Sequence, residues 1–100
     1  MDLCIGQIVY SKRGRDAGNA FVVLKLTDDG AFIADGKLRT LAKPKRKKRK
    51  HLCPTNSRAE ALTAKMERKE PLLDADLRKA LAASGMQGRN RSIESEELKL

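Results

Sequence analysis

The amino-acid sequence predicts a mainly β fold, a small barrel followed by a short helical extension. Runs of β-branched and aromatic residues fill the first half of the chain, and turn-forming residues bound each of them. Apolar residues recur at helical spacing only after Pro54. The chain has 100 residues, which allows one domain and an appendage. We expect the barrel over residues 1–55, two short helices over 56–85 and a flexible tail over 86–100.

Strands are expected where apolar and β-branched residues cluster, at residues 8–10, 20–26 and 31–34. The intervening turns are explicit, because the Asp-Gly pairs at 29–30 and 35–36 tolerate a positive φ and can reverse the chain between adjacent antiparallel strands. Strands that follow one another in sequence are therefore expected to be neighbours. The successive apolar residues 21–24 favour a strand that is buried on both faces or wrapped round a barrel corner, so we expect the sheet to close.

The candidate core comes from the whole of this first half. A domain of about 60 residues buries only about 60% of its unfolded surface, so such a core is marginal but sufficient. Its predicted members are Leu3, Ile5, Ile8, Val9, Phe21, Val23, Leu26, Phe32, Ile33, Leu38, Leu41 and Leu52.

Charge points to a polyanionic partner. The chain holds 22 Lys and Arg against 13 Asp and Glu, a net charge of +9. Residues 1–50 hold 13 of these cations and five of the acids, a balance of +8, whereas residues 51–100 hold nine and eight, a balance of +1. The two halves are therefore expected to have different roles.

One candidate binding element is the glycine loop between the first two predicted strands. Gly18 lets the main chain adopt conformations closed to other residues and lets a ligand backbone approach, and the cations Lys12, Arg13 and Arg15 project from the same loop. We interpret Asp16 as a residue that hydrogen-bonds within the loop rather than as a ligand contact. The alternative is a tight loop whose charges are merely solvated.

The second candidate element is the basic octet, residues 43–50, with seven cations in eight positions. Such a density of like charge repels itself, so we expect a charged hairpin arm that stays extended and mobile until a polyanion neutralises it. Pro44 marks a sheet edge or the start of the hairpin, and His51 with Leu52 returns the chain to the barrel. The alternatives are a nuclear import signal, a solvated charge run or contact with an anionic membrane, for which no amphipathic anchor adjoins the octet.

These residues resemble the KOW-motif proteins. Gly6 with Ile8 and Val9 resembles the opening of that motif, Gly18 its hallmark glycine, and residues 21–23 its second strand. Over residues 3–55 the chain is also similar to the archaeal and eukaryotic large-subunit ribosomal protein family called fourteen-e and to its short bacterial relatives. The further similarity lies in residues 14–18, 32–36 and the basic stretch that ends at 50–52. The residues after Cys53 match nothing in that family.

The resemblance implies an SH3-like barrel (KOW) and a role in translation, with ribosomal RNA or another structured RNA as the ligand. Together with the charge pattern it gives a non-catalytic, ribosome-associated RNA-binding protein that contacts RNA through the glycine loop and the basic arm. Because Tyr10, Phe21 and Phe32 are the only aromatic residues, contacts to shape and phosphate should outweigh base stacking. The predicted RNA-binding residues are Lys12, Arg13, Arg15, Gly18, Lys43, Lys45, Arg46, Lys47, Lys48, Arg49, Lys50 and His51.

Two helices are expected next. Residues 57–60 form a capping-box pattern before an apolar face of Ala59, Leu62 and Met66, with Thr63 off that face, and Pro71 should end this helix. A second helix is predicted over 74–84, with Asp74 as N-cap and Gly85 just past the end. Its apolar face comprises Leu77, Ala80 and Leu81.

The helices allow two roles. They are either an appendage, packed on the barrel or loosely tethered, or a partner-binding pair within residues 57–84 that uses Leu72 and Leu73. The alternative function for the whole chain is accordingly a protein-interaction adaptor that binds an acidic partner or uses this helical pair.

Other classes of function lack support in the sequence. His51 is the only histidine and no catalytic motif appears, so we expect no enzyme and no catalytic residue. Cys4 and Cys53 are too few for a zinc site, so we expect reduced thiols, no metal and no cofactor. The sequence shows neither a membrane span nor a signal peptide, which predicts a soluble cytoplasmic protein without a membrane partner.

Overall fold

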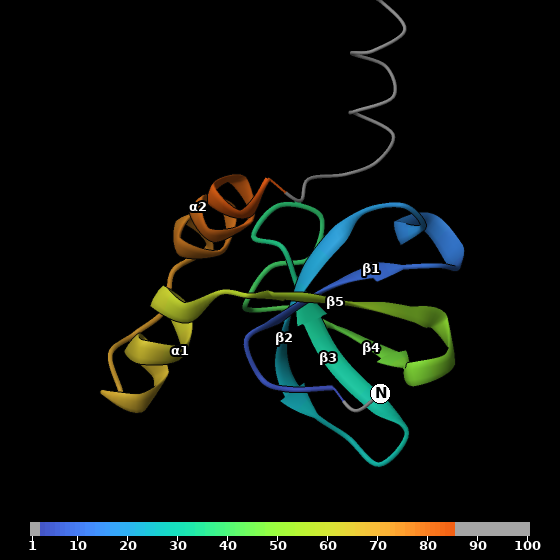
Figure 1. Cartoon of the computed structure of the whole chain (residues 1–100), viewed down its shortest axis with the longest axis horizontal. Helices are drawn as coiled ribbons and strands as arrows, with labels where there is room; N and C mark the ends of the chain where they lie inside the picture. Colours follow the sequence, from blue (N-terminus) through green and yellow to red (C-terminus); the bar gives the residue numbers. More distant parts are fainter. Residues whose placement is uncertain (1–2, 86–100) are drawn as a thin grey trace, which may run out of the picture.

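A five-stranded antiparallel sheet forms the centre of the computed structural model, which describes residues 3–85 (Figure 1). The spatial order of its strands is β4-β3-β2-β1-β5. The mainly β fold with a helical extension is therefore confirmed. In chain order the elements are β1 (Gln7–Ser11), the 3₁₀ helix η1 (Gly14–Asp16), β2 (Ala20–Leu26), β3 (Gly30–Ala34), β4 (Lys45–Lys48), the 3₁₀ helix η2 (Arg49–His51), β5 (Leu52–Arg58), α1 (Glu60–Glu67) and α2 (Asp74–Ser84).

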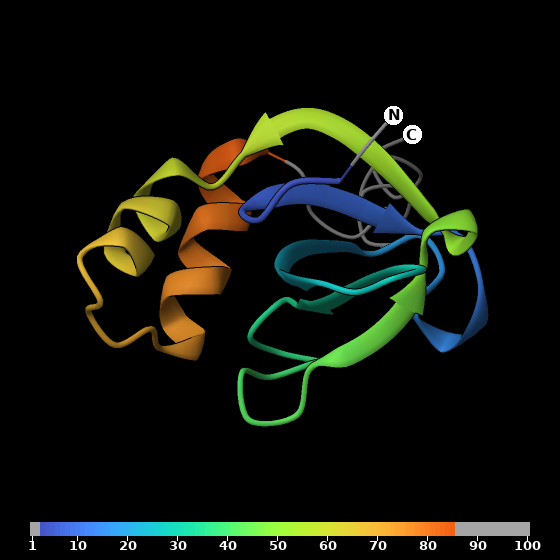
Figure 2. The same ribbon diagram turned by 90° about the horizontal axis from the view of Figure 1, so that it is seen from below.

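The first four strands are neighbours in sequence order, as the sequence predicts for strands that follow one another. β1 pairs with β2 through Val9 and Phe21, and β2 pairs with β3 through Val23 and Ile33. β5 breaks the sequence order, because it returns to pair with β1 and leaves β4 and β5 as the two edges. The sheet curves strongly but is not closed, so the closed barrel that the sequence predicts is not found among residues 3–85 (Figure 2).

Each face of the curved sheet carries its own hydrophobic core, because successive side chains of a strand point to opposite faces. The inner core contains Leu3, Val9, Phe21, Val23, Ala31, Ile33 and Leu52. The outer core joins the sheet to the helices and contains Ile8, Ala20, Val22, Ala34, Ala59, Leu62, Leu77 and Leu81. The continuous apolar run at residues 21–24 thus reflects a strand that is buried on both faces.

Four predicted core residues lie elsewhere. Ile5, Leu26 and Leu38 are 43%, 44% and 56% exposed. Phe32 is half-buried, because it lies opposite Arg46 near the edge of the sheet. Ile5 and Leu38 lie outside the strands, and Leu26 ends β2, where the strand leaves the core.

The prediction of a mobile arm over the basic octet was wrong. Lys45–Lys48 form the edge strand β4, which is hydrogen-bonded to β3 with Ala31 opposite Lys47. Gly30 permits this close approach, because a Cβ at that position would lie against the Lys47 carbonyl oxygen. A strand rich in lysine at a sheet edge is a common protection against unwanted strand pairing.

The predicted change from barrel to helix at Pro54 was also wrong. β5 continues to Arg58, since Pro54 lies on an edge strand, where a missing amide donor is tolerated. The Thr55 hydroxyl donates to the Ile8 carbonyl at 2.6 Å, which anchors this strand. Ser57 lies within β5, so it does not cap α1, whose N-cap is Ala59.

The turns behave differently from one another. The chain reverses between β2 and β3 as predicted, but Gly30 is the first residue of β3 and has no positive φ, so the predicted Asp-Gly turn geometry was wrong there. Gly36, with a φ of 79°, opens a longer connection that reaches β4 only at Lys45. The expected tight reversal at 35–36 was therefore wrong. The Asp35 carboxylate accepts hydrogen bonds from the backbone amides of Lys37 and Arg39 at 2.9 and 2.8 Å, so it shapes this connection.

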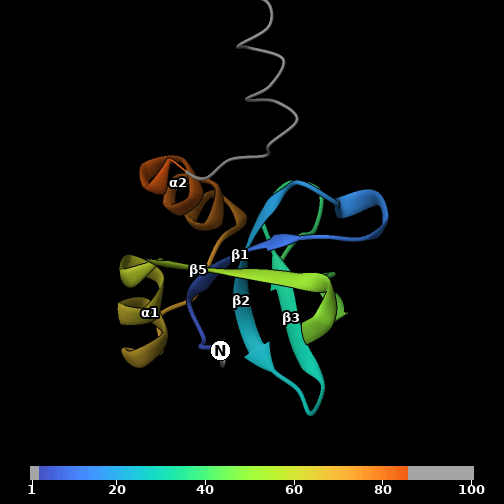
Figure 3. The same cartoon turned by 45° about the vertical axis from the view of Figure 1, so that its right-hand side comes forward.

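The helices pack at the end of the sheet where β5 finishes (Figure 3). α2 has the predicted bounds and ends at Gly85 with a φ of 76°. Asp74 is the first helical residue rather than the N-cap, which is Leu73, and its carboxylate instead accepts a hydrogen bond from the Leu41 amide at 2.8 Å. Leu77 is completely buried against the sheet.

α1 ends at Glu67, before the predicted stop at Pro71. Leu62 is buried and Met66 is half-buried on the predicted face. Because Leu77 and Leu81 belong to the outer core, they are not open to a partner, and of the predicted contact surface Leu73 remains 61% exposed. The predicted tail over 86–100 lies outside the described residues.

Candidate nucleic-acid interface

The two basic segments that the sequence singles out meet in space, at the end of the sheet opposite the helices (Figure 2). The Lys12 amide donates to the His51 carbonyl at 2.8 Å, which joins the β1–β2 loop (residues 12–19) to η2. The Lys47 side chain donates to the Arg13 carbonyl at 2.8 Å, which joins the same loop to β4. We use the name basic rim for the exposed cations of these three segments. They are Lys12, Arg13, Arg15, Lys45, Arg46, Lys48, Arg49 and Lys50.

Glycine shapes the β1–β2 loop. Gly14 and Gly18 have φ values of 77° and 86°, in the left-handed region that favours glycine. This is the conformational freedom that the sequence predicts for Gly18. Its amide, however, donates to the Ser11 carbonyl at 2.8 Å, so this donor is already used within the loop. Gly18 therefore sets the path of the loop, and the exposed donors of this segment are the side chains of Lys12, Arg13 and Arg15.

A buried ion pair lies beneath the loop. Asp16 is 3% exposed, and its carboxylate accepts hydrogen bonds from the Arg39 guanidinium, with Nε 3.2 Å from both oxygens and Nη2 3.1 Å from Oδ2. The ammonium of Lys47 lies 3.8 Å from the same carboxylate. The Asp16 carboxylate thus bonds partners outside its own loop, so the interpretation of a hydrogen bond within the loop was wrong for this side chain. Its partner Arg39, 23 residues away, carries no sequence signal that would have identified it.

Lys47 differs from the other cations of the octet. It is 8% exposed, whereas its neighbours on β4 are exposed, because this position of the strand faces the inner core beside Ala31. A buried ammonium requires partners, and Lys47 has two, the Arg13 carbonyl and the Asp16 carboxylate. Lys47 is therefore largely withdrawn from the surface, unlike the other predicted RNA-binding cations, and its side chain holds the loop against β4.

The remaining predicted cations are exposed. Lys43 lies just before β4 in the connection that leads to it. Arg46 pairs with Asp29 at 3.3 Å, with both side chains about half exposed, and a pair of this kind holds its partners only weakly. An incoming phosphate can therefore compete for Arg46.

His51 reports the positive potential of the rim. Its side chain is half-buried in η2, and this partial burial lowers its pKa below the usual value of 6.5. The charges of Lys50, Arg13, Lys47 and Lys48 lower the pKa further. Partial burial and the neighbouring cations thus both disfavour the protonated form of His51.

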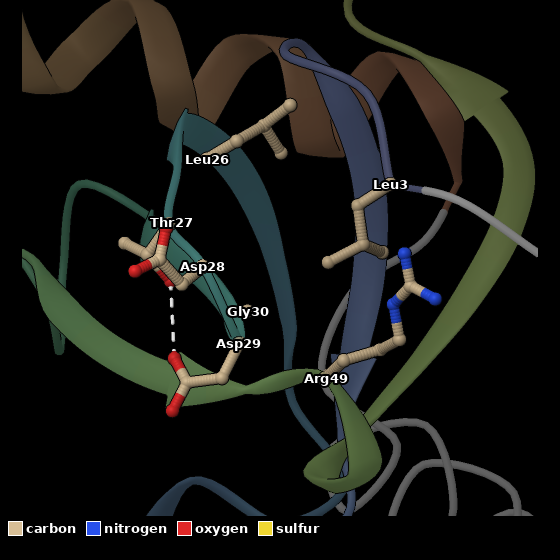
Figure 4. A pocket seen from close by; sticks show the side chains of 7 residues that line it. All are labelled: Leu3, Leu26, Thr27, Asp28, Asp29, Gly30 and Arg49. Atoms are coloured by element: carbon tan, nitrogen blue, oxygen red, sulfur yellow. Dashed lines mark hydrogen bonds between the residues drawn. The ribbon is translucent and has the colours of Figure 1, made fainter.

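Sequence reasoning missed a cleft beside the rim. It has a volume of about 530 Å³ and is lined by the N-terminal segment, the β2–β3 turn and η2 (Figure 4). Leu3, Leu26 and Gly30 contribute apolar surface, and Thr27, Asp28, Asp29 and Arg49 contribute polar groups. No sequence motif relates these segments, which the fold alone assembles.

Metal chemistry has no support in the part of the chain from residue 3 to residue 85. No three His, Cys, Asp or Glu side chains there lie close enough together to hold a metal ion. Cys4 and Cys53 are both free thiols. The same part of the chain contains no helix that is long and apolar enough to cross a membrane.

Comparison with known proteins adds no assignment, since neither a protein-family model nor a curated protein matches the chain.

Proposed function

We propose that this chain is a non-catalytic, cytoplasmic RNA-binding protein that grips structured RNA, ribosomal RNA in particular, through the basic rim. The observation that carries the proposal is the convergence of the β1–β2 loop, β4 and η2. Segments more than 30 residues apart present their cations together, because Lys47 ties β4 to Arg13 across 34 residues. A surface with this density of exposed Lys and Arg attracts a polyanion more strongly than it attracts a neutral molecule.

We further propose that the fold is a variant of the SH3-like barrel, of the KOW kind. Five antiparallel strands, a 3₁₀ helix between the fourth and fifth strands and a curved sheet whose last strand pairs with the first support this assignment. η2 brings the end of β4 towards the beginning of β5. The Arg49 amide donates a hydrogen bond to the Asp29 carbonyl, and the His51 carbonyl accepts one from the Lys12 amide. The sheet edges therefore approach one another at η2, although the sheet is not closed.

A structured RNA suits the rim better than an extended single strand. Phe21 is buried, Phe32 is half-buried and Tyr10 is partly buried against the outer core, so none of the aromatic side chains in residues 3–85 forms the exposed platform on which unstacked bases are usually bound. Arginine and lysine at the rim can contact phosphates along a folded backbone, and the planar guanidinium groups can bind them in a bidentate manner. Shape and phosphate spacing would then determine which RNA fits.

The test compares two variants with the same loss of charge. The rim variant replaces Lys12, Lys48 and Lys50 with Gln, and the control replaces Arg58, Lys69 and Lys79, which are exposed on β5, after α1 and on α2. RNA crosslinked to the full-length chain in its own cells is sequenced, and affinity for the recovered RNA is measured against salt. Each lost phosphate contact reduces the slope of log affinity on log salt by about 0.7 to 0.9.

The proposal predicts one discrete RNA site for the parent chain and the control. For the rim variant it predicts a slope reduced by roughly 2 to 3 and loss of that site. Equal effects of both variants would show that only net charge matters. No RNA above background for the parent chain would reject RNA binding and favour an acidic protein partner.

A further inference from the structure

The cleft beside the basic rim has the dimensions of a binding site for one small group. Its volume of about 530 Å³ lies within the range of about 300 to 1,000 Å³ that is typical of small-molecule sites. Leu3 forms one wall, the end of β2 with the β2–β3 turn forms another, and Arg49 of η2 forms the third (Figure 4). Arg49 also belongs to the basic rim. An RNA bound at the rim would therefore lie next to the cleft.

Hydrogen bonds fix the wall formed by the turn. The Thr27 amide donates to the Gly30 carbonyl at 2.9 Å, and the Arg49 amide donates to the Asp29 carbonyl at 2.7 Å. The Asp29 carboxylate accepts from the Thr27 hydroxyl and from Arg46, both at 3.3 Å. The cleft is therefore built by the backbone of the hairpin and of η2, and it needs no ligand to form.

The Asp28 carboxylate is a hydrogen-bond acceptor in this wall that has no partner within residues 3–85. Its side chain is exposed and lines the cleft, and within residues 3–85 its carboxylate makes no hydrogen bond or ion pair. An ionised carboxylate offers two oxygens and accepts two parallel hydrogen bonds from a suitably spaced donor pair. Asp28 thus favours a ligand with two adjacent N–H donors on one edge.

Of the four RNA bases, guanine has this edge, since its ring N1–H and its exocyclic amino group lie side by side. Adenine and cytosine offer an amino group beside an acceptor, and uracil offers one N–H between two acceptors. Leu3 and Leu26, the latter 44% exposed, provide apolar surface for the flat face of a base, and a guanidinium such as that of Arg49 can stack on it.

We infer that the cleft binds one unpaired guanine of the RNA, with Asp28 accepting its Watson–Crick edge. The inference rests on the proposed function and adds a base-specific contact to a rim that otherwise reads phosphate and shape. An unpaired base in a bulge or loop is the expected partner, because its Watson–Crick edge is not engaged in a duplex.

The experiment uses the full-length chain and four hairpin RNAs that differ only in one bulged nucleotide, which is G, A, C or U. Affinities are measured by fluorescence anisotropy at one salt concentration. The parent chain should bind the G hairpin about tenfold more tightly than the other three, which is the scale of one bidentate base contact. Asp28→Asn should reduce this preference to about twofold or less.

A matched control separates base recognition from charge. Glu67→Gln removes the same charge from an exposed position at the end of α1, so both variants should bind the A, C and U hairpins at least as tightly as the parent chain. Glu67→Gln should also keep the affinity for the G hairpin, whereas Asp28→Asn should bind that hairpin more weakly. Only Asp28→Asn should lose the preference for G. Circular dichroism of each variant shows that it is folded.

Two results would overturn the inference and leave RNA binding at the rim intact: equal affinity of the parent chain for all four hairpins, or a preference for G that survives in Asp28→Asn. Failure of the parent chain to bind any hairpin would overturn the proposed function together with this site.

Discussion

The ammonium group of Lys47 donates a hydrogen bond to the backbone carbonyl of Arg13, at 2.8 Å and across 34 residues of sequence. The contact turns one cation of the basic octet into an internal support. It also fixes where the other cations lie, because it holds the β1–β2 loop against β4. Within the basic octet, the exposed cations thus supply charge to the rim, whereas the buried Lys47 fixes its position.

Replacing Lys47 with Gln should lower the free energy of unfolding by about 1 to 3 kcal/mol, because the Arg13 carbonyl loses its donor and the buried Asp16 carboxylate keeps only Arg39 as a cationic partner. Replacing the exposed neighbour Lys48 with Gln should change it by less than about 0.5 kcal/mol. Urea unfolding of the two variants measures the difference. Equal midpoints would contradict the structural role of Lys47.

In RNA binding, the Lys48 variant should show the larger effect and the Lys47 variant the smaller one. Lys48→Gln should reduce the salt slope by about 0.7 to 0.9, the contribution of one phosphate contact. Lys47→Gln should leave the slope nearly unchanged wherever the variant is folded, since the ammonium is 8% exposed.

Two glycines should respond very differently to alanine. At Gly30 a Cβ would collide with the backbone of β4, so Gly30→Ala should reduce the free energy of unfolding by about 3 kcal/mol or more. At Gly85, with a φ of 76° and nothing within 4 Å of the added Cβ, Gly85→Ala should cost about 1 to 2 kcal/mol, the strain of a left-handed residue. Thermal and urea unfolding of both variants test the contrast. A small effect at Gly30 would mean that β4 is not tightly paired to β3.

RNA binding should raise the pKa of His51. In the free chain partial burial and the neighbouring cations hold this pKa below 6.5, and phosphate at the rim removes the repulsion. The complex then carries more protons than its free components. Affinity should therefore rise as the pH falls through the window between the pKa of the complex and the lower pKa of the free chain.

NMR titration of the imidazole resonances, with and without RNA, measures both pKa values of His51. His51→Gln should abolish the part of the pH dependence that lies in this window. An unchanged His51 pKa on binding would place the RNA away from η2.

The attachment of α1 to α2 should weaken in acid. The Asp76 carboxylate accepts hydrogen bonds from the Leu73 amide at 2.9 Å and from Lys65 at 3.0 Å, and these contacts lower its pKa. A carboxylate with a lowered folded-state pKa stabilises the fold above its unfolded pKa, about 3.9, and this stability is lost as the pH falls through the folded value.

Asp76→Asn should therefore be less stable than the parent chain at pH 7, and the difference should shrink as the pH falls below about 4. Urea unfolding at a series of pH values provides the measurement. A difference that stays constant with pH would show that the charge of Asp76 contributes nothing.

Local patterns predicted the elements that local physics determines. The β-branched runs of β1 to β3, the reversal of the chain between β2 and β3 and the bounds of α2 with its glycine end are confirmed. Each of these features depends on residues that are close in sequence. Neighbouring side chains and backbone propensity are therefore sufficient to predict it. The helical stop before Pro71 was predicted correctly in kind but came earlier, at Glu67.

Patterns failed where partners distant in sequence decide. A lysine-rich run has no strand propensity of its own, yet β3 offers it a pairing edge, and Gly30 leaves room for it. Pro54 discourages a strand in general, yet β5 is an edge strand, where its missing amide donor is tolerated.

The sequence by itself determined the mainly β character of this protein, the charge and location of its two basic segments and the glycines that shape the loop between β1 and β2. Only the tertiary structure decided that these segments meet, that Lys47 and Asp16 are internal while their neighbours are exposed, and that Asp28 and Arg49 line one cleft. The physical reason is that the charge and chemistry of a side chain are given by the residue type alone. Its burial and its neighbours depend on strand pairing and on the face of the sheet that the residue occupies.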